Sequence, residues 1–357
     1  MRRLLLPAIL LVAALVAGCG GSSKPKPVVA ASARALAPPE DTQVVTGAAQ
    51  GQDAGAYWTP ARMRDAKPIG LIRKHGSPDL SGRIPAPAGP RRLFRPARPA
   101  GGAASRPVSQ TRKSFKLNQA RGYPFPYARY RWSGPTSDLP ARTWGKVFFL
   151  APDGDYVCSG TAITSQNKSV VWTAGHCAAN GGARSFYSDR WIFVPGYDNG
   201  KAPFGRFVGK KFFTTKPWYN QGDSAYDLAA VVVAPLKGKT LVDMVGGQGI
   251  AFNQPRTEEY YSGGYPADYP FDGDSLYVCD APLGNNDRAE LPPTIAIGCD
   301  MTGGSSGGGW LVNVQNGLGT LVSVNSYGYY SQPDAMYGPY QGTVAQKLYE
   351  QASASTP

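Results

Sequence analysis

The chain has few of the residues that bind metals. Its 357 residues include only two histidines and five cysteines, and no Cys-x-x-Cys pair occurs. Zinc sites in proteins draw their ligands from cysteines and histidines at short spacings. The composition therefore argues against a metal site, and we expect neither a metal nor another cofactor.

The apolar run at the start of the chain is too short to cross a membrane. Residues 4–17 form this run of fourteen residues after Arg2 and Arg3, whereas a spanning helix needs about 20. A basic start and a short apolar run predict a signal peptide over residues 1–18. The run ends in Leu-Val-Ala-Gly-Cys19, which resembles the lipobox of bacterial lipoproteins and implies a lipid on Cys19 that anchors the chain to a membrane. An ordinary secretory signal with an incidental cysteine is the alternative.

Acidic residues are scarce in the first part of the chain. Residues 1–145 contain 23 Lys and Arg but 6 Asp and Glu, whereas residues 146–357 contain 14 and 18. The excess of positive charge is therefore confined to the N-terminal part. The high isoelectric point of the whole chain is then no evidence for nucleic-acid binding, and we expect no nucleic-acid partner.

Large apolar residues are few between residues 20 and 120, a stretch rich in Pro, Ala, Gly and Arg. Such a composition buries too little surface to offset the entropy of ordering the chain. We therefore expect residues 19–139 to be a disordered tether or pro-segment without a packed core. Its basic residues either are solvated or contact anionic lipids or cell-wall polymers.

From about Trp144 the composition changes to short runs of Val, Ile, Phe and Trp, separated by clusters of Gly, Pro, Asn and Asp. This pattern predicts a barrel or sandwich of strands, and hence an all-β fold over residues 140–357. One helix is expected at residues 342–351, where Val344 and Leu348 lie one turn apart. The expected strands are 147–150, 170–172, 191–194, 228–233, 276–278, 294–297, 310–314 and 321–324.

Four cysteines remain once Cys19 is set aside: Cys158, Cys177, Cys279 and Cys299. An even number in an exported domain indicates disulfides. Three pairings are possible, and we predict the sequential one, Cys158–Cys177 and Cys279–Cys299.

Three short motifs place a histidine, an aspartate and a serine in this order along the chain. They are Thr-Ala-Gly-His176-Cys, Tyr-Asp227-Leu-Ala at the start of an apolar strand, and Gly-Gly-Ser-Ser306-Gly-Gly. A serine hydroxyl becomes a nucleophile when a base removes its proton, and the base needs a partner that fixes its tautomer. Glycines around the serine let backbone N–H groups converge on a developing oxyanion. The motifs therefore indicate nucleophilic catalysis.

In these motifs, residues 140–357 resemble a serine peptidase of the chymotrypsin fold, in its bacterial glutamyl-endopeptidase-like branch. The segment Val-Pro-Gly-Tyr-Asp-Asn-Gly-Lys-Ala-Pro-Phe-Gly at residues 194–205 is similar to a loop of that branch. The resemblance implies two six-stranded antiparallel β-barrels with a C-terminal helix. It also implies hydrolysis of peptide bonds through an acyl-enzyme.

The resemblance gives each residue of the three motifs a role. Ser306 is the nucleophile, His176 is the base, and Asp227 orients the histidine. The N–H groups of Gly304 and Ser306 form the oxyanion hole. Ser305 is the alternative nucleophile, but the register of the motif favours Ser306.

Departures from the family pattern bear on the assignment. Asp223 is the alternative partner of the histidine, but no apolar strand follows it directly. His75 lies in the basic segment and is expected to play no part. Gly309 replaces a proline that is usual in the family, with small consequences. Ser305 replaces an aspartate that pairs with the new N-terminus in digestive members, so activation by that ion pair is not expected.

The residues that would contact a substrate are less well defined. Ser326, Tyr327 and Gly328 resemble the wall that pairs with the substrate backbone in this fold. Asn325 stands where glutamyl-specific members carry a histidine, so a preference for Glu is weakened. Asp300 stands near the pocket aspartate of trypsin-like members, and binding to loop N–H groups is its alternative role.

The sequence therefore predicts an exported serine endopeptidase that acts as a monomer on peptide or protein substrates. It would be held outside the cell membrane of a bacterium by the lipid, or secreted after processing. Two different functions remain open: a catalytically silent relative that serves as a binding module, and an envelope protein that acts through its basic arm. Labelling by a fluorophosphonate probe distinguishes the enzyme from both, because the probe needs an activated serine.

Overall fold

The computed structural model describes residues 44–49, 53–81, 83–101, 125–256 and 258–357. The predicted signal peptide and its lipid site lie outside these ranges. The helices are α1 (Ala54–Tyr57), α2 (Pro60–Asp65), α3 (Lys216–Gln221), α4 (Leu241–Val245) and α5 (Thr343–Ala354), with short 3-10 helices η2 (Ala141–Thr143), η3 (Gly175–Cys177) and η4 (Ser224–Tyr226).

The strands are β1 (Val44–Ala48), β2 (Lys67–Pro68), β3 (Ile72–Lys74), β4 (Arg92–Phe94), β5 (Ala128–Arg131), β6 (Trp144–Ala151), β7 (Gly154–Ile163), β8 (Val170–Thr173), β9 (Ala179–Asn180), β10 (Ser185–Phe186), β11 (Ile192–Pro195), β12 (Phe207–Thr215), β13 (Ala229–Val233), β14 (Gly249–Phe252), β15 (Glu259–Gly264), β16 (Tyr277–Asp287), β17 (Thr294–Gly298), β18 (Gly309–Gln315), β19 (Leu318–Val324), β20 (Tyr327–Tyr329) and β21 (Gln332–Gly338).

The first sheet closes into a barrel of six antiparallel strands. Hydrogen bonds join β11, β6, β7, β8, β13 and β12 in this order, and β12 pairs with β11 to close the ring. Every residue of β8 and β13 is buried. These strands consist mainly of valine and alanine, which pack well on a pleated surface inside a small barrel.

A second sheet carries the strands that follow in the sequence. It includes β21, β17, β16, β15, β18, β19 and β14 in this order, antiparallel except where β14 runs parallel to β19. A separate buried cluster, which includes Tyr260, Ile297 and Trp310, packs in this half of the molecule. The all-β prediction is confirmed, since the eight expected strands correspond to β6, β8, β11, β13, β16, β17, β18 and β19.

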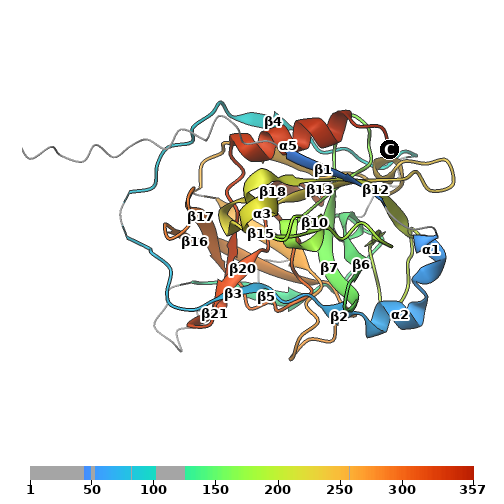
Figure 1. Cartoon of the computed structure of the whole chain (residues 1–357), viewed down its shortest axis with the longest axis horizontal. Coiled ribbons are helices and arrows are strands. Elements are labelled where there is room, and N and C mark those ends of the chain that lie inside the picture. The colour runs from blue at the N-terminus through green and yellow to red at the C-terminus, as the bar shows by residue number, and fades with distance from the viewer. Residues whose placement is uncertain (1–43, 50–52, 82, 102–124, 257) are drawn as a thin grey trace, which may run out of the picture. The chain divides into compact units, whose positions relative to one another are not determined.

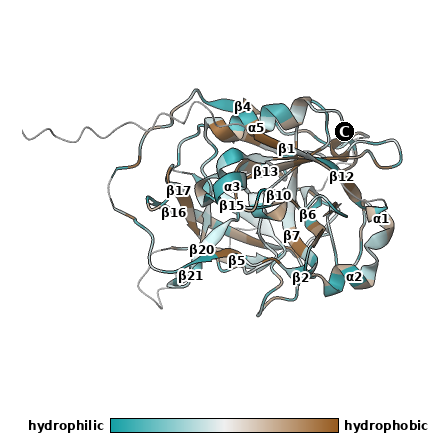
Figure 2. Cartoon of the chain, in the orientation of Figure 1, coloured by the Kyte–Doolittle hydropathy of each residue, from teal (hydrophilic) through white to brown (hydrophobic). Residues whose placement is uncertain are grey.

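The C-terminal helix α5 is also confirmed, and it extends to Ala354, beyond the predicted end. Its buried residues include Val344, Leu348 and Ala352, which lie four residues apart on one face. This face packs on β12, β13 and β14, and Figure 1 shows α5 beside β1 and β13. Figure 2 shows both apolar and polar residues along α5, as expected for a helix with one covered face. No helix within the described ranges is long and apolar enough to cross a membrane.

The segment before residue 140, for which no packed core is expected, forms strands and helices. β1 pairs with β12 over five residues, β4 pairs with β14, and β5 pairs with β16. Trp58 and Met63 are fully buried. The expectation of a disordered segment without a packed core is therefore wrong for the part of residues 19–139 that the structure describes, whereas the pro-segment stays a prediction. The physical reason is that these short strands add to the edges of existing sheets, which supply the hydrogen-bond partners that the segment cannot provide by itself.

Candidate active site

The strand β8 delivers His176 to the edge of the barrel. The chain leaves this strand at Thr173 and turns through η3, which contains the histidine. A side chain at Gly175 would place its Cβ 2.6 Å from Trp218 Cδ1 and 2.8 Å from Asp227 Oδ1. The glycine of the Thr-Ala-Gly-His motif is therefore needed because the aspartate packs directly against the backbone there.

Asp227 is the partner of this histidine. It follows η4, lies two residues before the apolar strand β13 and is inaccessible to solvent. His176 makes two contacts of 2.7 Å with the carboxylate. Its Nδ1 bonds to Oδ2, and its backbone N–H donates to Oδ1. Ser326 donates a third hydrogen bond of 2.6 Å to Oδ2. Three donors satisfy a carboxylate that burial would otherwise destabilise.

Ser306 lies at the centre of a glycine-rich turn before β18. Gly304 and Gly307 flank it with φ of +88° and +81°, which favour glycine. A Cβ at Gly307 would come within 2.0 Å of Thr173 Oγ1, so the turn packs tightly against the end of β8. The carbonyl of Ser306 accepts a 2.7 Å hydrogen bond from the Ser159 N–H on β7. The turn is thus fixed against the barrel.

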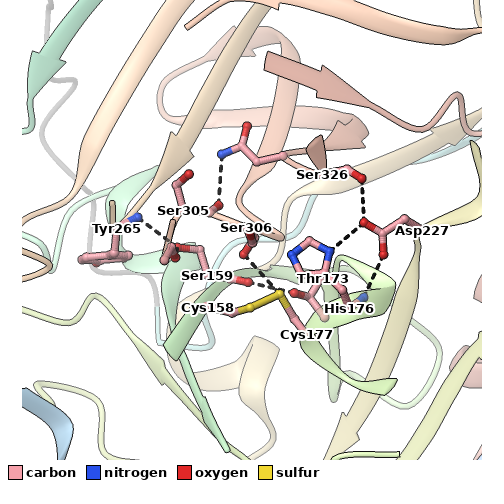
Figure 3. Close-up of a disulfide and its surroundings, with 12 residues drawn as sticks. Cys158, Ser159, Thr173, His176, Cys177, Asp227, Tyr265, Ser305, Ser306 and Ser326 are labelled. Carbon is pink, nitrogen blue, oxygen red and sulfur yellow. Dashed lines mark hydrogen bonds and ion pairs between the residues drawn. A yellow bond between two sulfur atoms is a disulfide. The ribbon is translucent and has the colours of Figure 1, made fainter. Parts of the chain in front are cut away.

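The hydroxyl of Ser306 and Nε2 of His176 are both buried, and neither has a hydrogen-bond partner among the described residues. Figure 3 shows the His176 ring with one nitrogen toward Asp227 and the other on the side of Ser306. The hydroxyl of Ser305, in contrast, donates to the carbonyl of Thr302 at 2.7 Å. The structure therefore brings His176, Asp227 and Ser306 together. The hydroxyl of Ser305 is instead hydrogen-bonded within the serine turn.

Asp223 and His75 have partners outside this group of three. Asp223 accepts a 3.0 Å hydrogen bond from the Ala225 N–H and so caps η4. His75 packs against the ring of Tyr330, with ring centroids 4.9 Å apart.

Two disulfides fix the surroundings, and both follow the predicted sequential pairing. Cys158 on β7 is bonded to Cys177 directly after the histidine, and Cys279 on β16 is bonded to Cys299 after β17. The two sulfurs of Cys158 and Cys177 lie near the histidine ring. Because they are joined in a disulfide, they are not thiolates that bind a metal.

Two of the predicted substrate contacts, Ser326 and Asn325, form hydrogen bonds within the protein. Ser326 bonds to Asp227, and Tyr327 and Gly328 form the start of β20. Asn325 is fully buried, and its Oδ1 accepts from Ser262 at 2.9 Å and from Trp310 at 2.7 Å. Its amide is thus hydrogen-bonded within the second sheet, and its role as a substrate contact stays a prediction.

Asp300 also has an internal partner. Its carboxylate forms an ion pair with Arg129 of β5 at 3.0 Å. While this ion pair is present, the Asp300 carboxylate is not free to bind an Arg or Lys of a substrate. The structure thus favours a structural role for this residue, which bonds to a guanidinium rather than to loop N–H groups.

An acidic group beside β20 has no counterpart in the sequence predictions. Asp287 is fully buried and accepts hydrogen bonds from the hydroxyls of Tyr327 at 2.8 Å and Tyr329 at 2.6 Å. Burial, together with the charge of Asp287, raises the pKa of Tyr327. Glu290 lies nearby and accepts a 2.7 Å hydrogen bond from Ser224. No motif marks either carboxylate, since their partners are far away in the sequence.

The chain is similar to several solved proteases. A scan against protein-family models finds no match. The chain is similar to the solved structure of protease Anisep from Arthrobacter nicotinovorans, with 41% identity and a TM-score of 0.58, over 64% of this chain and 100% of that one. It is also similar to the thermostable serine protease AL20 from an extremophilic microorganism, with 40% identity and a TM-score of 0.57, over 60% and 98%. A Glu endopeptidase shares the fold at 22% identity and a TM-score of 0.50, over 64% and 97%.

One curated relative is an extracellular metalloprotease of Bacillus subtilis (strain 168). It is 26% identical over 108 residues, which are 30% of this chain and 33% of the relative. The chain thus matches about a third of that relative's length.

The barrel, the second sheet and the glycine-rich serine turn define a protein of the chymotrypsin fold. At about 40% identity, the likeness covers all or nearly all of two solved proteases. The chain belongs to the chymotrypsin-fold serine proteases.

Proposed function

We propose that the chain is an exported serine endopeptidase that hydrolyses peptide bonds through Ser306, His176 and Asp227. The observation that carries the proposal is the arrangement of the histidine. Its Nδ1 is held 2.7 Å from a fully buried carboxylate, while neither Nε2 nor the serine hydroxyl has a hydrogen-bond partner among the described residues. An imidazole so oriented keeps Nε2 free to accept the serine proton.

The expected reaction follows from these contacts. Nε2 removes the hydroxyl proton as the oxygen of Ser306 attacks the substrate carbonyl, and Asp227 stabilises the resulting imidazolium. The N–H groups of Gly304 and Ser306 bind the oxyanion. The positive φ of Gly304 helps to form the turn that presents these two N–H groups. The imidazolium then protonates the leaving amine. His176 next takes a proton from a water molecule, which attacks the acyl-enzyme and releases Ser306.

The substrates are peptides or proteins, in line with the proteases to which the chain is similar. The two disulfides support a location outside the cytoplasm, where such bonds persist. We further propose a signal peptide over residues 1–18 and a lipid on Cys19 that attaches a monomeric protein to the bacterial envelope, with release by processing as a further step. Within the segment before residue 140, the described residues are proposed to act as a pro-segment.

A fluorophosphonate probe tests the proposal. Long incubation of the full chain, followed by mass spectrometry of its peptides, is expected to place the label on Ser306, and Ser306→Ala is expected to remain unlabelled. A binding module with an inactive site would show no labelled serine in either protein.

A further inference from the structure

A segment near the N-terminus crosses the candidate site from one sheet to the other. β2 runs parallel to β7 of the barrel, with Pro68 opposite Val157. Four residues later, β3 runs parallel to β20 of the second sheet, with Ile72 opposite Tyr327. Figure 1 shows this light-blue stretch between the labels β2 and β3. Residues 67–74, which we call the strap, are thus held at both ends by backbone pairing.

The middle of the strap lies against the turn that carries the nucleophile. The carbonyl of Ile69 accepts a 3.1 Å hydrogen bond from the N–H of Gly304, and its own N–H donates to Val157 at 3.1 Å. A Cβ at Gly303 would lie 3.1 Å from the Ile69 oxygen and 3.2 Å from Gly70 Cα. The strap therefore occupies a donor that the oxyanion hole needs.

The accessibility of the catalytic groups agrees with this contact. Ser306 is 0% exposed and His176 is 6% exposed in the full chain. Ser306 attacks a carbonyl only after its hydroxyl touches it, so the arrangement that includes the strap leaves the nucleophile closed to a substrate.

The end of the strap places a lysine in an acidic pocket. The Nζ of Lys74 bonds to Glu290 and donates to the hydroxyl of Ser224 at 2.6 Å, and this hydroxyl in turn bonds to the other oxygen of Glu290. The ammonium also lies 4.3 Å from the centroid of the Tyr327 ring. Carboxylate, hydroxyl and aromatic face together recognise a cation. Tyr327 belongs to the wall expected to pair with a substrate backbone.

We propose that the strap is an intramolecular inhibitor lying in the substrate groove, and that the pocket of Glu290, Ser224 and Tyr327 is a subsite for a basic side chain of the substrate. Both parts rest on the proposed peptidase function. Removal of residues 67–74 from the groove opens the oxyanion hole and exchanges Lys74 for a lysine or arginine of the substrate in the same pocket.

The strap is an inhibitor rather than a substrate because its flanks are fixed. In an attack on the Ile69 carbonyl, the chain from Gly70 onward is the leaving amine. This part stays paired with β20, and Leu71 within it is only 5% exposed. An amine held in place reverses acyl-enzyme formation. On the other side, the buried Trp58 and Met63 hold the chain before β2.

Substitution of either partner in the Lys74–Glu290 ion pair tests both the inhibitor and the subsite. Lys74→Gln weakens the strap and leaves the pocket acidic, whereas Glu290→Gln weakens the strap to a similar degree and makes the pocket neutral. In the full chain, both variants are expected to raise the rate of fluorophosphonate labelling at least about tenfold over wild type. Lys347→Gln and Glu350→Gln, on the exposed side of α5, are the matched controls and are expected to label at the wild-type rate.

Cleavage of a positional peptide library then tests the subsite. Lys74→Gln is expected to prefer Lys or Arg over norleucine about tenfold at one substrate position, and Glu290→Gln is expected to lose this preference. Equal profiles for the two variants would overturn the subsite. Leu71→Asp, which places a carboxylate where an apolar side chain is buried, is a second way to release the strap without changing the pocket.

The outcomes separate this inference from the proposed function. Rapid labelling of intact wild-type protein, equal to that of the variants, would overturn the inhibitor while leaving the peptidase in place. Wild-type protein found cut between Ile69 and Gly70 would also contradict it. If Ser306 is labelled in no variant, although all are folded by circular dichroism, the peptidase function itself fails.

Discussion

One buried carboxylate organises the candidate site at the scale of residues. Asp227 accepts three hydrogen bonds of 2.6 to 2.7 Å, two from His176 and one from Ser326. The backbone bond fixes where the histidine lies, and the side-chain bond fixes its tautomer. Because all three donors come from within the fold, the geometry exists before any substrate binds.

Replacement of this carboxylate is therefore expected to change the chemistry more than the fold. In Asp227→Asn, one oxygen becomes an NH₂ group that cannot accept a hydrogen bond, so the required tautomer of His176 is no longer favoured. We expect kcat to fall by about 10⁴-fold with little change in KM. Steady-state kinetics in the Lys74→Gln background measure this, and a loss smaller than tenfold would contradict the assigned role.

The two adjacent serines are expected to differ strongly. Ser306→Ala removes a hydroxyl that has no hydrogen-bond partner among the described residues, so we expect complete loss of labelling and a nearly unchanged Tm. Ser305→Ala removes the 2.7 Å bond to Thr302, which is expected to cost about 1 kcal/mol of stability while labelling persists. Probe labelling and thermal melts of both variants decide this, and the reverse pattern would show that the register is wrong.

At the scale of elements, the sequence predicts a strand best where the composition of the strand itself shows that it is buried. Runs such as Val170–Thr173 and Ala229–Val233 are wholly buried, so their composition alone identifies them. β2 and β3 have two and three residues and mixed composition. They exist because β7 and β20 offer edges to pair with, and no local pattern encodes such a partner.

The candidate site divides in the same way. The motifs around His176, Asp227 and Ser306 can be predicted because glycines and a cysteine mark them in the sequence. The contact of Ile69 with the N–H of Gly304 and the group of residues around Glu290 cannot be predicted in this way. They depend on residues that are more than 200 positions apart, such as Lys74 and Glu290.

The strand β6 carries an unusual buried lysine, and it leads to a pH-dependent prediction. Lys146 donates to the Gly273 carbonyl at 2.9 Å, and burial lowers its pKa to about 8. The folded state thus disfavours the charged form, and this penalty is complete below pH 8. It disappears as the pH rises toward the unfolded pKa of about 10.4, so the contribution of this lysine to stability increases with pH.

Urea unfolding of wild type and Lys146→Met tests this sign. The difference in unfolding free energy is expected to shift by about 3 kcal/mol in favour of wild type between about pH 7 and pH 10.5. Lys347→Met on the exposed side of α5 is the control and is expected to show no such shift. A pH-independent difference for Lys146→Met would mean that the lysine titrates normally.

At the scale of the whole molecule, the site is assembled from both sheets. His176 and Asp227 follow or precede barrel strands, whereas Ser306 and Ser326 come from the second half, and the bond of Ser326 to Asp227 joins them. The strap adds backbone bonds to both halves. Removal of the strap therefore breaks backbone hydrogen bonds to both halves of the molecule at once. The basic residues before position 146 and the acidic excess after it also place opposite charges on the two parts.

The last prediction concerns how the chain is attached to the cell envelope. If Cys19 carries a lipid, wild type is expected in the membrane fraction, and Cys19→Ser is expected to move to the soluble exported fraction with unchanged specific activity. The basic N-terminal part offers a competing explanation, because Lys and Arg bind anionic surfaces. Salt separates the two: charge attraction is screened over about 3 Å at 1 M ionic strength, whereas insertion of a lipid is not. Fractionation at low and high salt is therefore the measurement. Wild type that leaves the membrane at high salt would assign attachment to the basic residues, and Cys19→Ser that stays bound at high salt would rule out the lipid.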